Sequence, residues 1–248
     1  MTFAAAASAV LRTAIAAIGE YFVRSVSLFW VGPIVAALVV LPEFAQHVAE
    51  IRLGMFDSLA AAKIAGNDPL RWAFGYVKLT GLALTFFAAA RFWWCQTHGG
   101  RWYDLRQVGW GRLVVGFLLF MAVGSVGELA EPLTGEKAPL AVVIAASLLS
   151  LPFVFVMLAG LFGDRITPFK ALVWRSWPWL LLLALLLPLG FAPLMWWHNK
   201  NHLWAMGASD AAVWLLMIFD ALVVGLMASS VGTAMFIAYD RFHLGRMA

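Results

Sequence analysis

The chain has 248 residues, of which 63% are hydrophobic and only 12% are charged. Soluble domains carry roughly 25% charged residues, so this composition excludes a soluble globular protein. The net charge of +4 comes from Lys and Arg residues dispersed between apolar stretches, and this dispersal argues against nucleic-acid binding. Because Cys95 is the one cysteine, the chain forms no intrachain disulfide.

Residues 1–24 are predicted to form an amphipathic helix that lies on the cytoplasmic face of the membrane. Its apolar stripe has the helical spacing i, i+4, i+7 and i+11 and consists of Leu11, Ile15, Ile18 and Phe22. Arg12 interrupts the apolar core that a cleaved signal peptide would need, so none is expected. The alternative is a helix packed against the cytoplasmic end of a helix bundle.

Six nearly uncharged stretches follow within a single predicted domain, residues 25–248. A membrane helix needs roughly 20 apolar residues to cross about 30 Å of hydrocarbon. The predicted spans cover residues 25–42, 72–94, 110–130, 138–163, 176–198 and 211–239. The sequence therefore predicts an all-α polytopic membrane helix bundle with six transmembrane helices. The third span is the shortest, and it reaches the required length only if its charged ends, Arg112 and Glu128, lie at the interfaces.

The connection from Glu43 to Arg71 is the long one, and it is predicted to contain a helix on the outer face. Its stripe consists of Ile51, Met55, Leu59 and Ala62. This loop helix could also continue the first span beyond Pro42. Asp68 and Pro69 follow as an N-cap and a first helical residue, which predicts the start of the next helix.

The distribution of basic residues predicts the orientation. Arg91, Arg101, Arg106 and Arg112 flank one connection, and most of the remaining basic residues fall on the same side of the predicted bundle. Cytoplasmic loops are enriched in Lys and Arg. We therefore expect a multi-pass protein of the inner (plasma) membrane with both termini in the cytoplasm.

Two groups of potential metal ligands are predicted on the outer side. Glu43, His47 and Glu50 share one helical face with the spacing i, i+4 and i+7, and His198 and His202 are spaced i, i+4. Imidazoles and carboxylates suit zinc, iron or copper, so a transition metal or a haem is a candidate cofactor. The alternative interpretation is an exposed charged face without a ligand, and no cofactor is required by the sequence.

Pro188, Gly190 and Pro193 lie within the fifth predicted span. These residues weaken a helix, and discontinuous helices carry substrate sites in transporters. The pattern therefore marks a candidate helix break, but a simple kink is the favoured expectation, because neighbouring helices can satisfy the freed backbone groups.

Lys78 and Asp220 are charged residues inside predicted spans. An unpaired charge at the bilayer centre costs roughly 2.5–3.5 kcal/mol on insertion scales, so such residues tend to face the bundle interior and find partners. We predict that they form an intramembrane ion pair or a transport site. A purely structural pair and a lysine that extends to the interface are the alternatives.

The motifs of phosphate-binding loops, metalloproteases and serine hydrolases are absent from the sequence, so no catalytic residue is predicted. The leading functional hypothesis is a binding, assembly or accessory role in the membrane, with lipid or another membrane protein as the partner. Transport of a small solute or lipid through Asp220 and Lys78 is the alternative. A metal- or haem-binding membrane protein is the third hypothesis.

Overall fold

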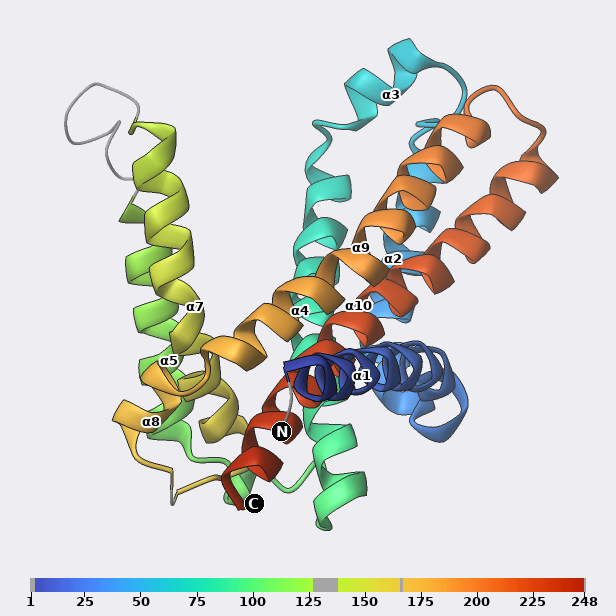
Figure 1. Cartoon of the computed structure of the whole chain (residues 1–248). Coiled ribbons are helices and arrows are strands. Elements are labelled where there is room, and N and C mark those ends of the chain that lie inside the picture. Colours follow the sequence, from blue (N-terminus) through green and yellow to red (C-terminus); the bar gives the residue numbers. More distant parts are fainter. Residues whose placement is uncertain (1–2, 127–137, 166, 248) are drawn as a thin grey trace. The chain divides into compact units, whose positions relative to one another are not determined.

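The computed structural model describes residues 3–126, 138–165 and 167–247, with side chains described between residues 15 and 244 of these ranges. All regular elements in the described ranges are helices (Figure 1). Five of them are long and apolar enough to cross a membrane. They are α2 (Pro33–Arg52), α4 (Pro69–His98), α7 (Leu140–Phe162), α9 (Trp177–Ala205) and α10 (Asp210–Met247). The protein is thus an all-helical protein with the apolar helices of a membrane protein.

The remaining helices are shorter or lie at the N-terminus. They are α1 (Phe3–Val31), α3 (Leu59–Ala65), the 3-10 helix η1 (Leu105–Gln107), α5 (Trp110–Gly124) and α8 (Phe169–Trp174). The chain packs as two compact units. Unit 1 contains Met1–Trp93 and Leu185–Phe236, and unit 2 contains Trp94–Ala184 and Ile237–Ala248. The sequence had suggested a single domain without this internal division.

The first predicted span does not coincide with one helix. α1 continues through the expected start of the span and ends at Val31, and α2 begins at Pro33. The residue before a proline is biased away from the helical region, and proline itself is favoured in the first turn. Gly32 therefore separates the two helices, which corrects the predicted boundaries of both the N-terminal helix and the first span.

α2 passes through Pro42 and continues to Arg52, so the first membrane helix extends into the predicted outer loop. The predicted loop helix is divided. Gly54, with φ at +67°, lies in the turn that follows α2. The Ser58 hydroxyl then caps α3 by accepting a hydrogen bond from the backbone amide of Ala61. The stripe from Ile51 to Ala62 is consequently shared by two helices and the turn between them.

The third predicted span is represented by α5, which has 15 residues. At about 1.5 Å per residue such a helix is about 22 Å long, shorter than the hydrocarbon core of about 30 Å. Residues 127–130 of the predicted span lie outside the described residues. The count of six transmembrane helices therefore stays a prediction.

α9 is one uninterrupted helix, so the helix break predicted at Pro188, Gly190 and Pro193 is wrong. Prolines are tolerated in membrane helices when neighbouring groups satisfy the backbone. Gly190 has a packing role instead, because a Cβ atom at this position would overlap the hydroxyl of Tyr21 and would lie 3.1 Å from Ser230 Cβ. The glycine thus allows α1 and α10 to approach α9 within unit 1.

Unit 1 contains two apolar clusters that are used below. The first, called the floor, is centred on Val39, Val223, Val224, Met227 and Ala228. The second, called the loop-side cluster, is centred on Phe56, Ala205, Val213 and Met217. Both clusters combine residues of α2 or its following turn with residues of α9 and α10.

In unit 2, α5 and α7 pack closely through glycines. A Cβ atom at Gly116 would lie 2.8 Å from Met157 Cα, and one at Gly160 would lie 2.8 Å from Leu113 Cα. The Gly109 amide also donates a 2.8 Å hydrogen bond to the Gly160 carbonyl. Small residues that let two helix backbones approach are typical of helix packing in membranes.

Candidate metal centre

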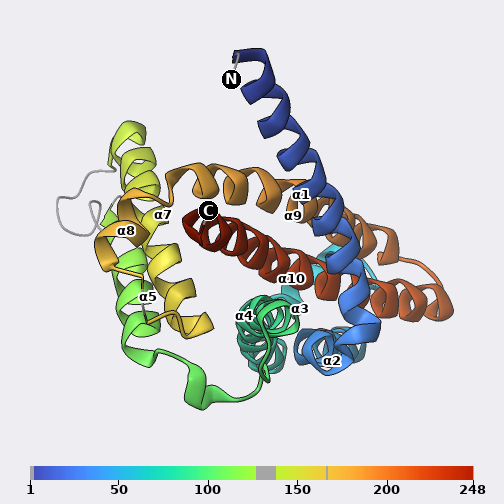
Figure 2. The same cartoon turned by 60° about the horizontal axis from the view of Figure 1, so that its bottom comes forward.

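Histidines and carboxylates from three helices of unit 1 meet at one point. α2 contributes Glu43, His47 and Glu50, α9 contributes His198 and His202, and α10 contributes Asp220. These three helices lie side by side in both Figure 1 and Figure 2. The regular i, i+3 and i+4 spacings on α2 and α9 place the side chains of each helix on one face.

Asp220 is the centre of this group. Its Oδ2 atom lies 2.7 Å from His198 Nδ1, 3.1 Å from His47 Nε2 and 3.5 Å from His202 Nε2. The other carboxylate oxygen, Oδ1, accepts a 2.8 Å hydrogen bond from the Asn201 amide. One oxygen therefore faces three imidazole nitrogens, while the second oxygen fixes the orientation of the carboxylate.

The group is largely shielded from solvent. Glu43 and Asp220 are 0% exposed, and His47 and Glu50 are each 1% exposed. The side chains of His198 and His202 retain 17% and 20% exposure. Burial of an unpaired charge is costly. A group with this many ionisable side chains is therefore buried only when they pair with one another or with a cation.

His47 lies between carboxylates at both ring nitrogens. Its Nδ1 atom is 2.9 Å from Glu50 Oε2, and its Nε2 atom faces Asp220 at 3.1 Å and Glu43 at 3.3 Å. A neutral imidazole carries one N–H and donates at one nitrogen only. If Nδ1 donates to Glu50, the Nε2 lone pair points at two carboxylates. That end of the ring therefore needs a positive charge, either a second ring proton or a bound cation.

Glu50 is itself held in place by two donors. Gln46 Nε2 and Arg71 Nε each donate to Glu50 Oε1 at 2.9 Å. A carboxylate that accepts from the outer nitrogen of a histidine is the usual second layer of a metal site, because it fixes the tautomer and the orientation of the ring. When His47 Nδ1 donates to Glu50, Nε2 of His47 faces Asp220 and is held in that orientation by Glu50.

Lys78 does not pair with Asp220 as the sequence had suggested. Its Nζ atom donates to Glu43 Oε1 at 2.9 Å. The physical reason is the rotation of the helices about their axes. The side chain of Lys78 on α4 points to Glu43 on α2, whereas the side chain of Asp220 on α10 points to the histidines of α9 and to His47. Glu43 and Glu50 therefore each face a lysine or an arginine, and Asp220 is balanced by imidazoles or by a cation among them.

The donor set fits a single transition-metal ion. These residues form three overlapping groups of potential ligands. Within each group the ligand atoms lie within 4.8 Å of one another, and one of the groups consists of His198, His202 and Asp220. A tetrahedral zinc with bonds of about 2.0–2.1 Å separates its ligand atoms by about 3.3 Å. The distances from Asp220 Oδ2 to the three imidazoles, 2.7, 3.1 and 3.5 Å, lie on both sides of that separation, and none of the three groups contains all four of these residues. A haem, in contrast, takes one or two axial ligands on opposite faces of a plane.

Two buried atoms of the group have further capacity to bind. Glu43 Oε2 and His202 Nε2 make no hydrogen bond within the described part of the chain. Buried polar atoms in folded proteins are nearly always satisfied, so such an exception needs an explanation. A cation coordinated within the group would supply it, since both atoms belong to residues of the ligand sets.

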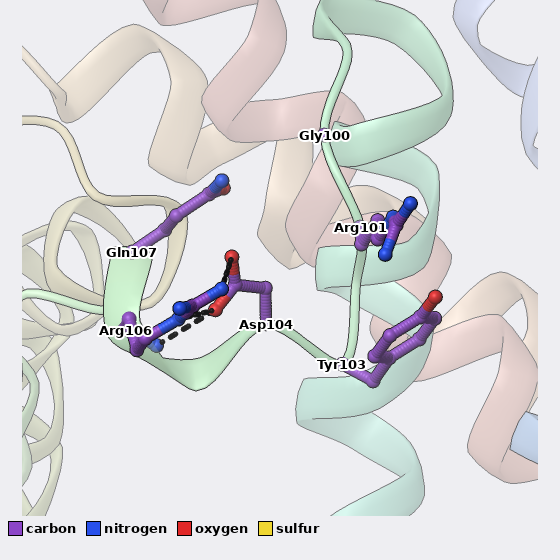
Figure 3. A pocket seen from close by; sticks show the side chains of 6 residues that line it. All are labelled: Gly100, Arg101, Tyr103, Asp104, Arg106 and Gln107. Carbon is purple, nitrogen blue, oxygen red and sulfur yellow. Dashed lines mark hydrogen bonds and ion pairs between the residues drawn. The ribbon is translucent and has the colours of Figure 1, made fainter.

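A separate pocket of about 430 Å³ lies in unit 2, in the connection from α4 to α5 (Figure 3). Its lining includes Arg101, Tyr103 and Gln107. Arg106 pairs with Asp104 at 2.9 Å, and this hydrogen bond raises the pKa of the Arg106 guanidinium. The carboxylate of the pocket is thus already matched by an arginine, and the lining lacks histidine and cysteine. Its chemistry therefore does not resemble a transition-metal site.

All five residues that the sequence suggested as metal ligands lie in the central group, but the sequence did not join them to Asp220. Asn201 and Arg71 were missed as well. A signal for Asp220 exists in the sequence: α9 and α10 form an antiparallel pair, and His198 and Asp220 are separated from the intervening turn by seven and ten residues. Residues at similar distances from such a turn lie at similar depths.

No family model matches the chain, and no curated protein or solved structure is significantly similar to it. The geometry of the central group is therefore the main indication of function.

Proposed function

We propose that this protein is a multi-pass membrane protein that binds one divalent transition-metal ion, with zinc as the best fit, between α2, α9 and α10. The convergence of three imidazole nitrogens on one oxygen of Asp220 carries the proposal. His47, His198, His202 and Asp220 are the ligands, and Glu43 lies beside them. A divalent ion would balance the charge of Asp220 and occupy the space that the His47 Nε2 lone pair faces.

The ligand count supports a resident ion that stabilises the bundle. Catalytic zinc sites have three protein ligands and a water, whereas structural sites have four protein ligands. His198, His202 and Asp220 provide three ligand atoms within 4.8 Å of one another, and His47, 3.1 Å from Asp220 Oδ2, would move in as the fourth ligand when the ion binds. The ion would then link three helices whose ligands are far apart in the sequence, from His47 to Asp220. This role is consistent with an accessory membrane protein, and it needs no catalytic residue.

We also propose the complete topology. α5 belongs to the third of six spans in the inner membrane, and both termini are cytoplasmic. The basic residues between α4 and α5 support this orientation. The metal centre then lies near the outer face, because its ligands are close to the ends of α2 and α9 that lead into the outer connections.

Elemental analysis of the purified full-length chain tests the metal site. The protein should be extracted in a mild detergent without chelators and with an affinity tag that contains no histidine. We expect near-stoichiometric zinc or another first-row divalent metal. The double variant His47→Ala, His198→Ala should lose it, because two ligands of the shell are removed.

The matched control is the double variant His98→Ala, His243→Ala in unit 2. His98 and His243 also face carboxylates, at 2.7 Å from Asp240 and 3.9 Å from Asp164. This variant should keep its metal. Folded wild-type protein that neither contains a divalent metal nor takes one up from micromolar solution would contradict the proposal.

Transport is the second candidate function, favoured by the buried carboxylates of Glu43 and Asp220 and by the half-buried Lys78 within the bundle. Proteoliposomes that contain a zinc-sensitive dye separate the two functions. Zinc bound to the protein without entry of zinc into the vesicles supports a resident ion. Zinc flux that disappears in Asp220→Asn would support transport instead.

A further inference from the structure

The metal centre is closed on one side by the floor. Val39 is four residues before Glu43 on α2, Leu194 is four residues before His198 on α9, and Val224 is four residues after Asp220 on α10. Each of the three helices therefore places apolar residues one turn away from its ligands, in the same direction. Val39 is 0% exposed and Val224 is 3% exposed. Such an apolar layer opposes the passage of a hydrated cation.

On the opposite side, the protein has an acidic cavity. It encloses about 250 Å³, and Asp57 and Asp210 line it together with Phe56 and Val213. Both carboxylates are exposed, so they carry their charge in contact with solvent. A concave surface lined by charges of one sign concentrates ions of the opposite sign and accelerates their association.

Phe56 separates this cavity from the metal centre. Its ring is 4% exposed and lies 5.8 Å from the ring of His202, centroid to centroid. The Phe56 carbonyl accepts a 2.8 Å hydrogen bond from the Gly207 amide, so the turn after α2 is attached to the turn between α9 and α10. One aromatic side chain thus contacts a ligand on one face and lines the acidic cavity on the other.

From these observations we infer that divalent cations reach and leave the metal centre through the cavity beside Asp57 and Asp210, with Phe56 closing the passage, and not through the floor. The inference rests on the proposed metal site and adds its access route. Asp57 and Asp210 attract the hydrated ion, and displacement of the Phe56 ring then exposes His202, which is the outermost ligand by its 20% side-chain exposure.

Uptake and release kinetics of Zn²⁺ test the route with the full chain in detergent. Uptake can be followed by competition with a fluorescent zinc chelator at low ionic strength. The double variant Asp57→Asn, Asp210→Asn should take up Zn²⁺ about tenfold more slowly than the wild type, and added salt should reduce the difference. Asp68→Asn is the control for loss of an acidic charge in unit 1 outside the cavity; it removes one carboxylate where the double variant removes two, and asparagine also caps a helix.

Release into excess chelator tests the role of Phe56. Phe56→Ala should accelerate release several-fold, whereas Val39→Ala in the floor should not. Equal acceleration by both variants, or an uptake rate in Asp57→Asn, Asp210→Asn equal to that of Asp68→Asn, would overturn the route. In either of those cases near-stoichiometric zinc in the wild type would still support the site itself. Wild-type protein without zinc binding would remove both.

Discussion

Glu50 orients His47, one of the proposed metal ligands. It accepts from His47 Nδ1 at 2.9 Å and is oriented by Gln46 and Arg71. We predict that Glu50→Gln lowers the zinc affinity about 10–100-fold, the usual effect of removing such an outer partner. The dissociation constant should be measured by chelator competition, with circular dichroism to verify that the helices remain.

Glu20→Gln is the control for this variant. Glu20 also pairs with an arginine in unit 1, Arg24 at 2.8 Å, but on α1 and away from the ligands. It should leave the zinc affinity unchanged, and Glu50→Asp should recover part of the affinity that Glu50→Gln loses. Equal affinities in Glu50→Gln and the wild type would show that Glu50 does not position His47.

The Lys78–Glu43 contact gives a second prediction at this scale. Lys78→Met removes the partner of a carboxylate that is 0% exposed, and breaking a buried pair in this way costs about 3–5 kcal/mol of folding stability. The combined variant Lys78→Met, Glu43→Gln should recover part of this loss. Thermal melts of metal-free protein in detergent, analysed as a double-mutant cycle, should show coupling of about 0.5–3 kcal/mol.

The same cycle with Asp220→Asn in place of Glu43→Gln distinguishes the two possible partners of Lys78. Asp220 contacts imidazoles and Asn201 instead of Lys78, and His47 links it to the Lys78–Glu43 pair, so its coupling to Lys78 should be clearly smaller than that of Glu43. Strong coupling to Asp220 would restore the pairing that the sequence alone suggested.

Residue types were more predictable than their partners. The i, i+4 spacings of Glu43 with His47 and of His198 with His202 depend only on helix geometry, so they could be found from the sequence. The pairing of Lys78 with Glu43 depends on the rotation of α4 against α2. Hydrophobic patterns indicate the depth of a residue in the membrane, but they do not indicate how a helix is rotated toward its neighbours. For this reason the sequence suggested an ion pair between Lys78 and Asp220.

At the scale of helices, prolines were ambiguous because their effect depends on what surrounds them. Pro33 ends the preceding helix at Val31, whereas Pro42, Pro188 and Pro193 lie within continuous helices. A proline is tolerated wherever neighbouring groups satisfy the backbone, and the sequence does not show those neighbours. The central positions of α4, α7 and α10 were predictable because long apolar segments have few alternatives in a membrane.

The packing of α5 against α7 gives a prediction for this scale. A Cβ atom at Gly160 would overlap the Leu113 amide, which belongs to backbone and cannot move aside like a side chain. Gly160→Ala should therefore destabilise unit 2 by about 1–3 kcal/mol, as overpacking of a close contact does. The thermal midpoint of the protein in detergent measures the effect.

Gly111→Ala provides the comparison for this substitution. Gly111 lies on α5, and a Cβ atom there would have no neighbour within 4 Å. The same change should be neutral or slightly stabilising, since alanine favours a helix over glycine by about 1 kcal/mol. A midpoint for Gly160→Ala that matches that of Gly111→Ala would mean that the two helices are not packed at this contact.

At the scale of the whole molecule, the number of spans decides on which side of the membrane the termini lie. Five helices have the length and apolarity to cross, and an odd number of crossings would separate the two ends of the chain. If α5 crosses as well, both ends are on one side. We predict six crossings, because the connection between α4 and α5 is rich in arginine and favours the cytoplasm.

Reporter fusions test this topology directly. A fluorescent protein that folds in the cytoplasm should be active at either terminus, and a phosphatase that is active only outside the cytoplasm should work when fused after Gly207, in the turn between α9 and α10. Cytoplasmic fluorescence at one terminus alone would indicate five crossings. The position of Gly207 also decides the access route, because the acidic cavity lies beside this turn, at Ala208 and Asp210. If Gly207 lies outside the cytoplasm, the proposed metal centre takes its ion from outside the cytoplasm. If the phosphatase is inactive there and a fluorescent protein is active at the same position, the ion enters from the cytoplasm.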